Sequence, residues 1–434
     1  MRYIISTLGC KVNQYETQAM ETLLRSHGHV PAAPGELADA VIVNTCAVTA
    51  ESGRKSRQLI RRLRDENPNA VVAVCGCYSQ LEPDAVESIG AKVVFGAADR
   101  AKFVDAVERA VAEGKGLRCI DKPFERRLFE SLPAGAIGGR TRAMLKIQDG
   151  CVNFCSYCVI PYTRGRLRSL PVADAAAESA RLAAEGYREL VLTGIEIASY
   201  GADLPDRPDL ADVVCAVAAA GCGMRVRLGS LEPTVMTDDM CRRLADAGTL
   251  CRHFHLSLQS GCDRTLKAMN RKYDTAAFLA VTERLRSYFP GCALTTDLIV
   301  GFPGESEEDH AQTLDFIRRC GFADMHIFPY SRRPGTPADK LPQQCTAAVK
   351  SRRAAEAQRV ADEMRAEYMS ACVGKSLPVL FESGDGRGSF GHSDNYMPVR
   401  VEESGLHGQI KSVRISGVAD GELVGTPEPE GVSQ

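Results

Sequence analysis

The residues best suited to chemistry are three cysteines, Cys151, Cys155 and Cys158, at the spacing Cys-x₃-Cys-x₂-Cys. They follow an apolar run at residues 143–147 that predicts a β-strand. A cubane iron–sulfur cluster has four positions for protein ligands, so three thiolates leave one iron free for a small molecule. An open coordination position is what a catalytic metal site needs. A zinc site usually adds a second Cys or His pair nearby, and this sequence has none there.

Three further cysteines, Cys10, Cys46 and Cys77, each follow a predicted strand. The strands are expected at 3–7, 40–44 and 70–74, alternating with helices at 13–27 and 51–65, the first of which Asn13 is able to cap. This alternation predicts a parallel α/β sheet, in which all three loops emerge at one edge. We therefore expect a second three-thiolate site. Spacing alone does not separate Cys77 from Cys75 as its third ligand.

Composition limits the class of protein. The chain has 434 residues, 44% hydrophobic and 25% charged, with a formal charge of −2, as expected for a globular protein of two or three domains without an overall basic signature. We find no apolar run long enough to span a bilayer and no N-terminal leader, which predicts a cytoplasmic protein without a membrane partner. Seventeen cysteines, an odd number in clustered motifs, favour metal ligation over disulfides.

The middle of the chain repeats a strand–helix unit. The expected strands are 143–148, 189–193, 225–228, 253–258, 293–300 and 324–328. Six such units predict a partial (β/α)₆ barrel with its chemistry at the carboxyl ends of the strands. Glycines there are turn residues by default. The polar residues Glu196, Glu232, Gln259 and Asp297 need partners, which a zwitterionic ligand with hydroxyl groups would supply.

After residue 374 short strands predict a small β-barrel, at 376–381, 396–401, 409–415 and 422–424. A predicted loop at 388–396 carries Phe390 and Tyr396, which suit stacking on unpaired bases but equally suit the core of a hairpin.

Basic residues gather near both cysteine sets. Arg54 and Lys55 lie on the helix after Cys46, and Arg164 and Arg166 follow Cys158. Both groups are candidates for RNA phosphate contacts, although a solvated helix face explains the first group equally well.

With these motifs in place, the whole chain resembles the methylthiotransferases of the radical S-adenosylmethionine (SAM) superfamily. The resemblance rests on the cysteine spacing with Tyr157 before the last cysteine, on residues 7–13, 44–49 and 161–166, and on the runs 255–261 and 297–304. It implies an N-terminal cluster domain (1–114), a linker (115–139), a radical SAM domain (140–370) and an RNA-binding TRAM domain (371–434).

The resemblance also implies the ligands. Cys10, Cys46 and Cys77 would hold an auxiliary [4Fe–4S] cluster, with Cys77 preferred to Cys75 because residues 76–80 fit the family pattern. Cys151, Cys155 and Cys158 would hold the [4Fe–4S] cluster that binds SAM. Candidate SAM contacts, which the resemblance and the strand-end positions suggest together, are Tyr157, Gly194, Glu196, Glu232, Gln259 and Asp297.

The implied activity is the conversion of N6-threonylcarbamoyladenosine at tRNA position 37 to its 2-methylthio derivative, with two SAM used per product. One SAM would methylate a sulfur at the auxiliary cluster. The other would yield the radical that drives replacement of the hydrogen at C2, an unactivated aryl carbon, by the methylthio group. The partners would be the tRNA anticodon stem-loop, an electron donor and a sulfur source. Two alternatives act on other substrates, isopentenyladenosine tRNA or a ribosomal protein aspartate, and a third is a non-catalytic iron–sulfur RNA-binding protein.

Overall fold

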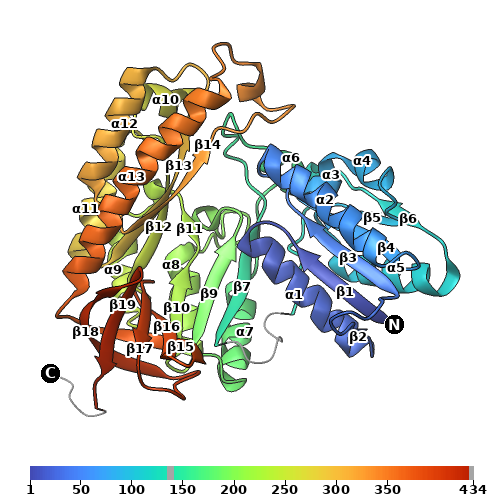
Figure 1. Ribbon diagram of the computed structural model, residues 1–434, viewed down its shortest axis with the longest axis horizontal. Coiled ribbons are helices and arrows are strands. Elements are labelled where there is room, and N and C mark those ends of the chain that lie inside the picture. The colour runs from blue at the N-terminus through green and yellow to red at the C-terminus, as the bar shows by residue number, and fades with distance from the viewer. Residues whose placement is uncertain (134–140, 430–434) are drawn as a thin grey trace.

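The computed structural model describes residues 1–133 and 141–429 and confirms the predicted fold class (Figure 1). A parallel α/β unit, a partial barrel and a closed β-barrel follow one another along the chain. Residues 134–139 of the predicted linker, the first residue of the predicted radical SAM domain and the last five residues of the predicted TRAM domain lie outside the described residues. Within the described residues, no helix is both long and apolar enough to cross a membrane.

The N-terminal sheet has six parallel strands in the order β2-β1-β3-β4-β5-β6. Its strands are β1 (Arg2–Thr7), β2 (Val30–Pro31), β3 (Ala40–Thr45), β4 (Val71–Gly76), β5 (Val93–Phe95) and β6 (Leu117–Cys119). Its helices are α1 (Lys11–Ser26), α2 (Ala50–Glu66), α3 (Cys77–Leu81), α4 (Pro83–Glu87) and α5 (Arg100–Glu113), and the short helix η1 (Pro123–Glu125) follows β6.

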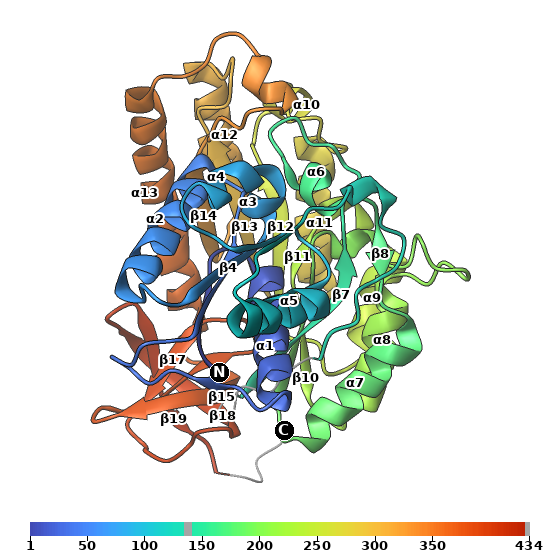
Figure 2. The ribbon, with the colours of Figure 1, turned by 90° about the vertical axis from the view of Figure 1, so that its right-hand side faces the viewer.

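Both faces of this sheet are covered, which explains why β3 and β4 are buried and apolar over most of their length. Helices α1 and α5 pack on one face around Met20 and Phe103. Helices α2, α3 and α4 pack on the other face around Ile60 and Tyr78. Figure 2 looks onto this unit, and α1 contacts the barrel strands β7 and β9 behind it.

The central unit is the predicted partial barrel, built from two four-stranded sheets ordered β10-β9-β7-β8 and β11-β12-β13-β14. Its strands are β7 (Arg142–Asp149), β8 (Arg168–Ser169), β9 (Glu189–Gly194), β10 (Arg225–Leu228), β11 (Ser230–Leu231), β12 (His253–Gln259), β13 (Ala293–Val300) and β14 (Asp324–Pro329). Pairing is parallel except between β7 and β8, and an isolated parallel bridge pairs Val226 of β10 with Leu250, which precedes β12.

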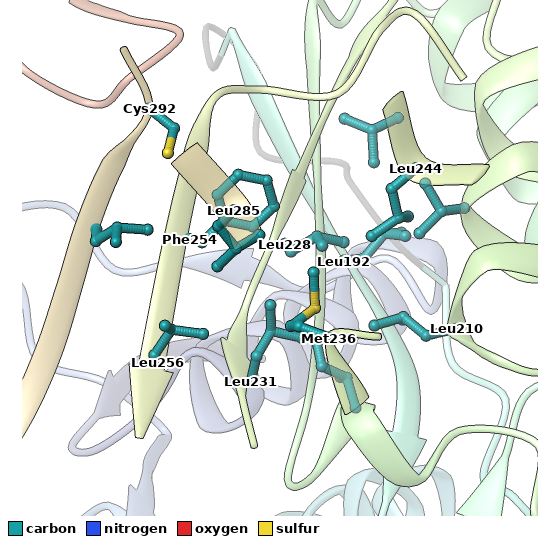
Figure 3. Packing of buried hydrophobic residues seen from close by; sticks show 14 of the residues in the cluster. Leu192, Leu210, Leu228, Leu231, Met236, Leu244, Phe254, Leu256, Leu285 and Cys292 are labelled. Carbon is teal, nitrogen blue, oxygen red and sulfur yellow. The ribbon is translucent and has the colours of Figure 1, made fainter. Parts of the chain in front are cut away.

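The helices of the central unit cover the outer surface of the partial barrel, except α6, which packs against α3 of the N-terminal unit. They are α6 (Ile160–Arg164), α7 (Val172–Ala184), α8 (Leu210–Ala220), α9 (Asp238–Asp246), α10 (Asp263–Ala268), α11 (Thr275–Tyr288) and α12 (Glu307–Cys320), with short helices η2 (Ile197–Ser199), η3 (Pro233–Val235) and η4 (Pro337–Lys340) between them. Leu210 of α8, Leu244 of α9 and Leu285 of α11 pack onto strand residues such as Leu228 and Phe254 (Figure 3). Burial of this apolar surface fixes the strand ends that carry the candidate site.

The long helix α13 (Ala347–Cys372) runs along β14 and leads into the C-terminal barrel. This barrel closes in the order β15-β16-β17-β19-β18, with β15 (Ser376–Asp385), β16 (Gly388–Ser393), β17 (Pro398–Val401), β18 (Ile410–Ala419) and β19 (Glu422–Pro427). The predicted loop at 388–396 was wrong in its first part, because Gly388–Ser393 forms β16. Gly391 permits the pairing, since a Cβ there would lie 2.1 Å from the Leu380 carbonyl oxygen.

Candidate active site

The sheet edge brings Cys10, Cys46 and Cys77 together. Cys10 precedes α1, Cys46 follows β3, and Cys77 begins α3 directly after β4. Gly9 has a φ of +116°, and a Cβ there would lie 3.0 Å from Cys46 Sγ, so only glycine fits between the two loops. Desolvation, with further contributions from the nearby Cys77 and Cys46 thiols, raises the pKa of Cys10 to about 11.

Asn13 holds this arrangement and is not the helix cap that the sequence suggested, because α1 already begins at Lys11. Its side-chain amide donates to the carbonyl oxygens of Leu8 at 2.8 Å and Thr45 at 3.0 Å. The first carbonyl lies two residues before Cys10 and the second one residue before Cys46. Asn13 therefore fixes two of the three cysteine loops relative to each other.

Cys75 lies apart from the trio. Its side chain is fully buried in the core on the α1 side of the sheet, with Sγ 4.0 Å from Met20 Sδ. Burial raises its pKa to about 12. Cys77 packs with the other core, near Tyr78. This separation supports Cys77 as the third member of the set.

The second trio lies in the loop between β7 and α6. The Cys158 amide donates to the Cys155 carbonyl at 3.0 Å, and the Asn153 amide donates to Cys151 Sγ at 3.5 Å. Burial raises the pKa of Cys158 to about 12, with the neighbouring Cys155 and Cys151 thiols contributing. The three sulfurs are therefore close enough to influence one another's charge.

One arginine from elsewhere in the chain reaches each trio. Arg164 donates from Nε to Cys77 Sγ at 3.3 Å, and Arg271 donates from Nη1 to Cys155 Sγ at 3.2 Å. A cation beside a thiol stabilises the thiolate form that a metal requires. Each trio thus combines three sulfurs with one guanidinium, a donor set that fits a [4Fe–4S] cluster with one iron left open.

The candidate SAM contacts divide into two groups. Glu196 accepts from Asn153 Nδ2 at 3.0 Å, and its other oxygen, Oε1, has no hydrogen-bond partner among the described residues although it is buried. Burial, with the nearby Glu232, raises the pKa of Glu196 to about 7. Glu232 itself forms an ion pair with Arg271. Both carboxylates therefore lie around the second trio.

The other predicted SAM residues have different surroundings. Tyr157 packs near Phe302 and Tyr330, and burial raises its pKa well above the ordinary value. Gly194 lies against the Gln148 carbonyl, 2.8 Å from where a Cβ would be. Gln259 ends β12 with a φ of +68°. Asp297 lies mid-strand in β13 beside His255, inside the barrel.

The candidate RNA residues also differ. Arg54, Lys55 and Arg166 are exposed, and Arg54 pairs with Glu51 on its own helix. Arg164 is fully buried and bonded to Glu16 and Asn13, which removes it from a phosphate-binding surface and corrects that prediction. Its burial reflects the position of α6 against α3.

The two aromatic candidates of the C-terminal barrel are partly exposed. Phe390 packs against Arg400. Tyr396 stacks on His253 at 5.1 Å between ring centroids and faces the partial barrel. The C-terminal barrel therefore presents Tyr396 to the cavity next to the partial barrel.

The sequence reasoning missed an exposed aromatic cluster, formed by Phe124, Phe154 and Tyr162. Their exposed fractions are 37%, 40% and 41%, and their ring centroids lie 6.0–6.4 Å apart. Phe154 belongs to the loop of the second trio, and the other two flank it. Phe154, an aromatic residue within the cysteine motif, was the sequence feature that could have indicated this cluster.

A cavity of about 540 Å³ lies where the N-terminal unit, the partial barrel and the C-terminal barrel meet. Cys10 and Lys11 line it from the N-terminal unit, Gly194 from the strand end next to Glu196, and Tyr396 from the C-terminal barrel. Small-molecule sites usually have volumes of about 300–1,000 Å³. The cavity is therefore large enough for a nucleoside in contact with all three units.

A buried ion cluster fixes the N-terminal unit to the barrel. Glu16 of α1 pairs with Arg100 at 2.8 Å, with Lys146 of β7 at 3.3 Å and with Arg164 of α6. These side chains are fully buried. Burial alone would raise the pKa of Glu16, but the three cations hold it well below its ordinary value. The cluster sets the position of one trio relative to the other.

Comparisons with known proteins agree with this architecture. A family model described as "Radical SAM superfamily" matches residues 145–317, and one described as "Uncharacterized protein family UPF0004" matches residues 2–96. The structure of the radical SAM methyltransferase TsrM from Kitasatospora setae has a TM-score of 0.58 at 15% identity, covering 89% of this chain and 79% of TsrM. This similarity concerns the fold.

Curated relatives cover nearly the whole chain. Threonylcarbamoyladenosine tRNA methylthiotransferase MtaB from Bacillus subtilis is 37% identical over 94% of this chain and 92% of its own length. The protein of the same name from Thermotoga maritima is 35% identical over 96% and 94%. A tRNA-2-methylthio-N(6)-dimethylallyladenosine synthase from Sphingopyxis alaskensis is 36% identical over 98% and 97%.

Proposed function

Because this chain belongs to the family of radical SAM tRNA methylthiotransferases, we propose that it replaces the C2 hydrogen of N6-threonylcarbamoyladenosine at tRNA position 37 with a methylthio group. The observation that carries the proposal is a cavity lined by Cys10 of the first trio and by Gly194 at the end of β9. One adenosine in that cavity would lie beside Cys10 of the first trio and beside the carboxyl end of β9, where Glu196 follows Gly194.

The enzymes of this family use SAM and two [4Fe–4S] clusters. We assign Cys10, Cys46 and Cys77 to the auxiliary cluster and Cys151, Cys155 and Cys158 to the cluster that binds SAM. When bound, SAM and the clusters would supply the methyl group and the one-electron chemistry that an unactivated aryl carbon requires and that no side chain provides.

The protein's own residues position SAM and restrain the cysteine loops. Glu196 is held by Asn153 on one side, and its backbone amide donates to Gln148 Oε1 at 2.7 Å. Its unpartnered oxygen Oε1 is therefore oriented to accept from a polar group of SAM. Arg271 bridges Glu232 and Cys155, which keeps the Glu232 carboxylate beside the same loop.

For the tRNA partner we propose that the anticodon loop rests on the exposed aromatic cluster Phe124, Phe154 and Tyr162. Unpaired bases stack on such rings, and sequence-specific RNA recognition usually targets loops. Arg166 is exposed beside Arg126, Arg127 and Val152 and would contact phosphate there. Arg54 and Lys55 would extend this basic surface along α2.

The reaction also consumes electrons and sulfur. We propose that a separate electron donor and a separate sulfur source act as transient partners of this protein.

A second candidate substrate is dimethylallyladenosine in tRNA. The specific observation in its favour is the 36% identity to the synthase from Sphingopyxis alaskensis, nearly equal to that of the MtaB relatives. Overall identity therefore does not decide between the two substituents at N6.

The deciding experiment is nucleoside analysis of tRNA from a strain that lacks the gene, with the wild-type gene and a Cys155→Ala variant as complementing copies. We expect 2-methylthio-N6-threonylcarbamoyladenosine to disappear on deletion and to return only with the wild-type gene. An unchanged amount of this nucleoside in the deletion strain would refute the proposed substrate.

A further inference from the structure

The far wall of the cavity carries a group of polar side chains that neither trio uses. His255 of β12, Asp297 of β13 and His326 of β14 lie on adjacent strands, with one side-chain nitrogen or oxygen of each within 4.8 Å of the others. His255 Nε2 lies 3.4 Å from Asp297 Oδ1, and the two imidazole rings lie 5.9 Å apart. All three residues line the cavity.

The strand register explains this meeting. Asp297 and His326 are paired positions on neighbouring strands, and His255 pairs with Thr295, two residues before Asp297. Side chains two residues apart on a strand face the same side, so all three point into the barrel. His255 and His253 share the Thr295 hydroxyl at 3.0 Å each, which fixes the His255 ring.

A cation faces the same space from the N-terminal unit. Lys11 lines the cavity directly after Cys10, and within the described parts of the chain its ammonium group has no ion-pair partner. His326 has no hydrogen-bond partner among the described residues either, and it is exposed. Two donors without partners among the described residues, Lys11 and His326, therefore lie around the same part of the cavity as the His255–Asp297 pair.

We propose that Lys11, His255, Asp297 and His326 form the subsite that binds the threonylcarbamoyl substituent at N6, an inference that rests on the proposed function. Lys11 and His326 donate to the carboxylate of the substituent, and His255 holds Asp297 in place. Asp297 accepts from its hydroxyl or urea N–H. The subsite selects this substituent over dimethylallyl, and it gives Asp297 a role on the substrate rather than on SAM.

The chemistry of the competing substituent supports this choice. A dimethylallyl group has no hydrogen-bonding atoms, so its burial here would shield Lys11 and His326 from water without giving either a hydrogen-bond partner. Sites that are built to hydrogen-bond a substrate group reject analogues that lack it far more strongly than apolar pockets reject polar analogues. The exposed Phe328 at the same cavity offers a face for the adenine ring, which both substrates share.

The test compares anticodon stem-loops that are identical except for the base at position 37: threonylcarbamoyl, dimethylallyl or unsubstituted adenosine. Reconstituted full-length protein acts on a mixture of the three under anaerobic conditions, and nucleoside analysis gives the ratio of kcat/KM values. We expect His326→Leu to lower kcat/KM for the threonylcarbamoyl substrate about 10- to 100-fold relative to the dimethylallyl one, with partial recovery in His326→Gln. Stem-loop affinity, measured by fluorescence anisotropy without SAM, should shift in the same order.

The matched control is His27→Leu, which removes a histidine that also contacts an acid, Glu108, but lies on the N-terminal unit away from the cavity. It should leave the selectivity unchanged. Equal losses of kcat/KM on all three substrates in His326→Leu would overturn the proposal. So would a zinc or manganese ion that is bound by the wild type and lost in His326→Leu, because His255, Asp297 and His326 would then be a metal site. A wild-type protein that modifies none of the stem-loops but still cleaves SAM would refute the proposed function instead.

Discussion

Arg164 and Cys77 are 87 positions apart in the sequence, yet the guanidinium donates from Nε to the thiol at 3.3 Å. Arg164 ends the short helix that follows the second trio, and Cys77 belongs to the first. The same guanidinium also contacts Glu16 and Asn13. One buried side chain therefore connects the loops of both proposed clusters.

Replacing Arg164 should destabilise the whole protein. Arg164→Gln leaves the buried Glu16 carboxylate short of a partner, and breaking such a pair typically costs about 3–5 kcal/mol. Urea denaturation of the cluster-free protein measures this free energy of unfolding. Arg54→Gln is the control, because Arg54 is exposed and, among the residues that the structure describes, forms an ion pair only with Glu51 on its own helix. Equal urea midpoints for the two variants would contradict the role assigned to Arg164.

Removal of the proposed ligands should change the iron content in a defined way. We expect about eight irons per chain in the wild type and about four in Cys46→Ala, because one of two [4Fe–4S] clusters is lost. Cys46→Ala should still cleave SAM when reduced but form no methylthio product. Cys75→Ala is the matched control, since that thiol lies in the core on the other side of the sheet, and a loss of iron in this variant would reverse the choice of Cys77.

The aromatic cluster should contribute to tRNA affinity. Phe124→Leu keeps an apolar side chain but removes a ring on which a base can stack, and loss of one stacking contact costs about 1–3 kcal/mol. We expect the Kd for the anticodon stem-loop to rise about 5- to 100-fold in fluorescence anisotropy. Leu128→Ala removes a neighbouring apolar group that is 85% exposed and should leave the Kd unchanged; similar effects of both substitutions would argue against stacking.

Acid should weaken the contact between the partial barrel and the C-terminal barrel. Arg225 and Arg227, which donate to carbonyl oxygens of the C-terminal barrel, are both held by Glu189 of β9. Burial alone would raise the pKa of Glu189, but Arg227, Arg225 and Arg142 hold it well below its ordinary value. A carboxyl group with a depressed pKa stabilises the folded state above its unfolded pKa of about 4.3 and loses that contribution as the pH falls further. The free energy of unfolding should therefore be steady from pH 7 to about 5 and decline below about pH 4.

Glu189→Gln provides the comparison for this pH dependence. It leaves Arg225 and Arg227 without their carboxylate, from which they lie 2.5 and 2.7 Å away. Stability at pH 7 should fall by about 3 kcal/mol. The variant should then lose less stability than the wild type between pH 5 and pH 3, and parallel pH curves would show that Glu189 is not responsible.

Much of the fold could be predicted because it depends on local patterns. Alternating strands and helices indicate parallel sheets, and parallel sheets bring strand ends to one edge, so the meeting of Cys10, Cys46 and Cys77 follows from periodicity and position. The strand at Gly388–Ser393 was missed because its glycines and polar residues are typical of turns. Their actual reason is the close approach of the neighbouring strand.

The long-range partners of the site could not be predicted in the same way. The burial of Arg164 and the reach of Arg271 to Cys155 depend on how the units pack, which leaves no trace in spacing. Likewise, the sequence marks His255 and His326 as ordinary strand residues. Only the register of β12, β13 and β14 brings them to Asp297.

The ion cluster around Glu16 has a consequence for the catalytic cycle. Opening a hinge between the N-terminal unit and the barrel would break the buried ion pairs that Glu16 forms with Lys146 and Arg164. The folded protein therefore fixes the distance between the two cysteine sets before substrate binds. We therefore expect the RNA, and not the protein, to change conformation on binding, because the target base must leave its stack to enter the cavity.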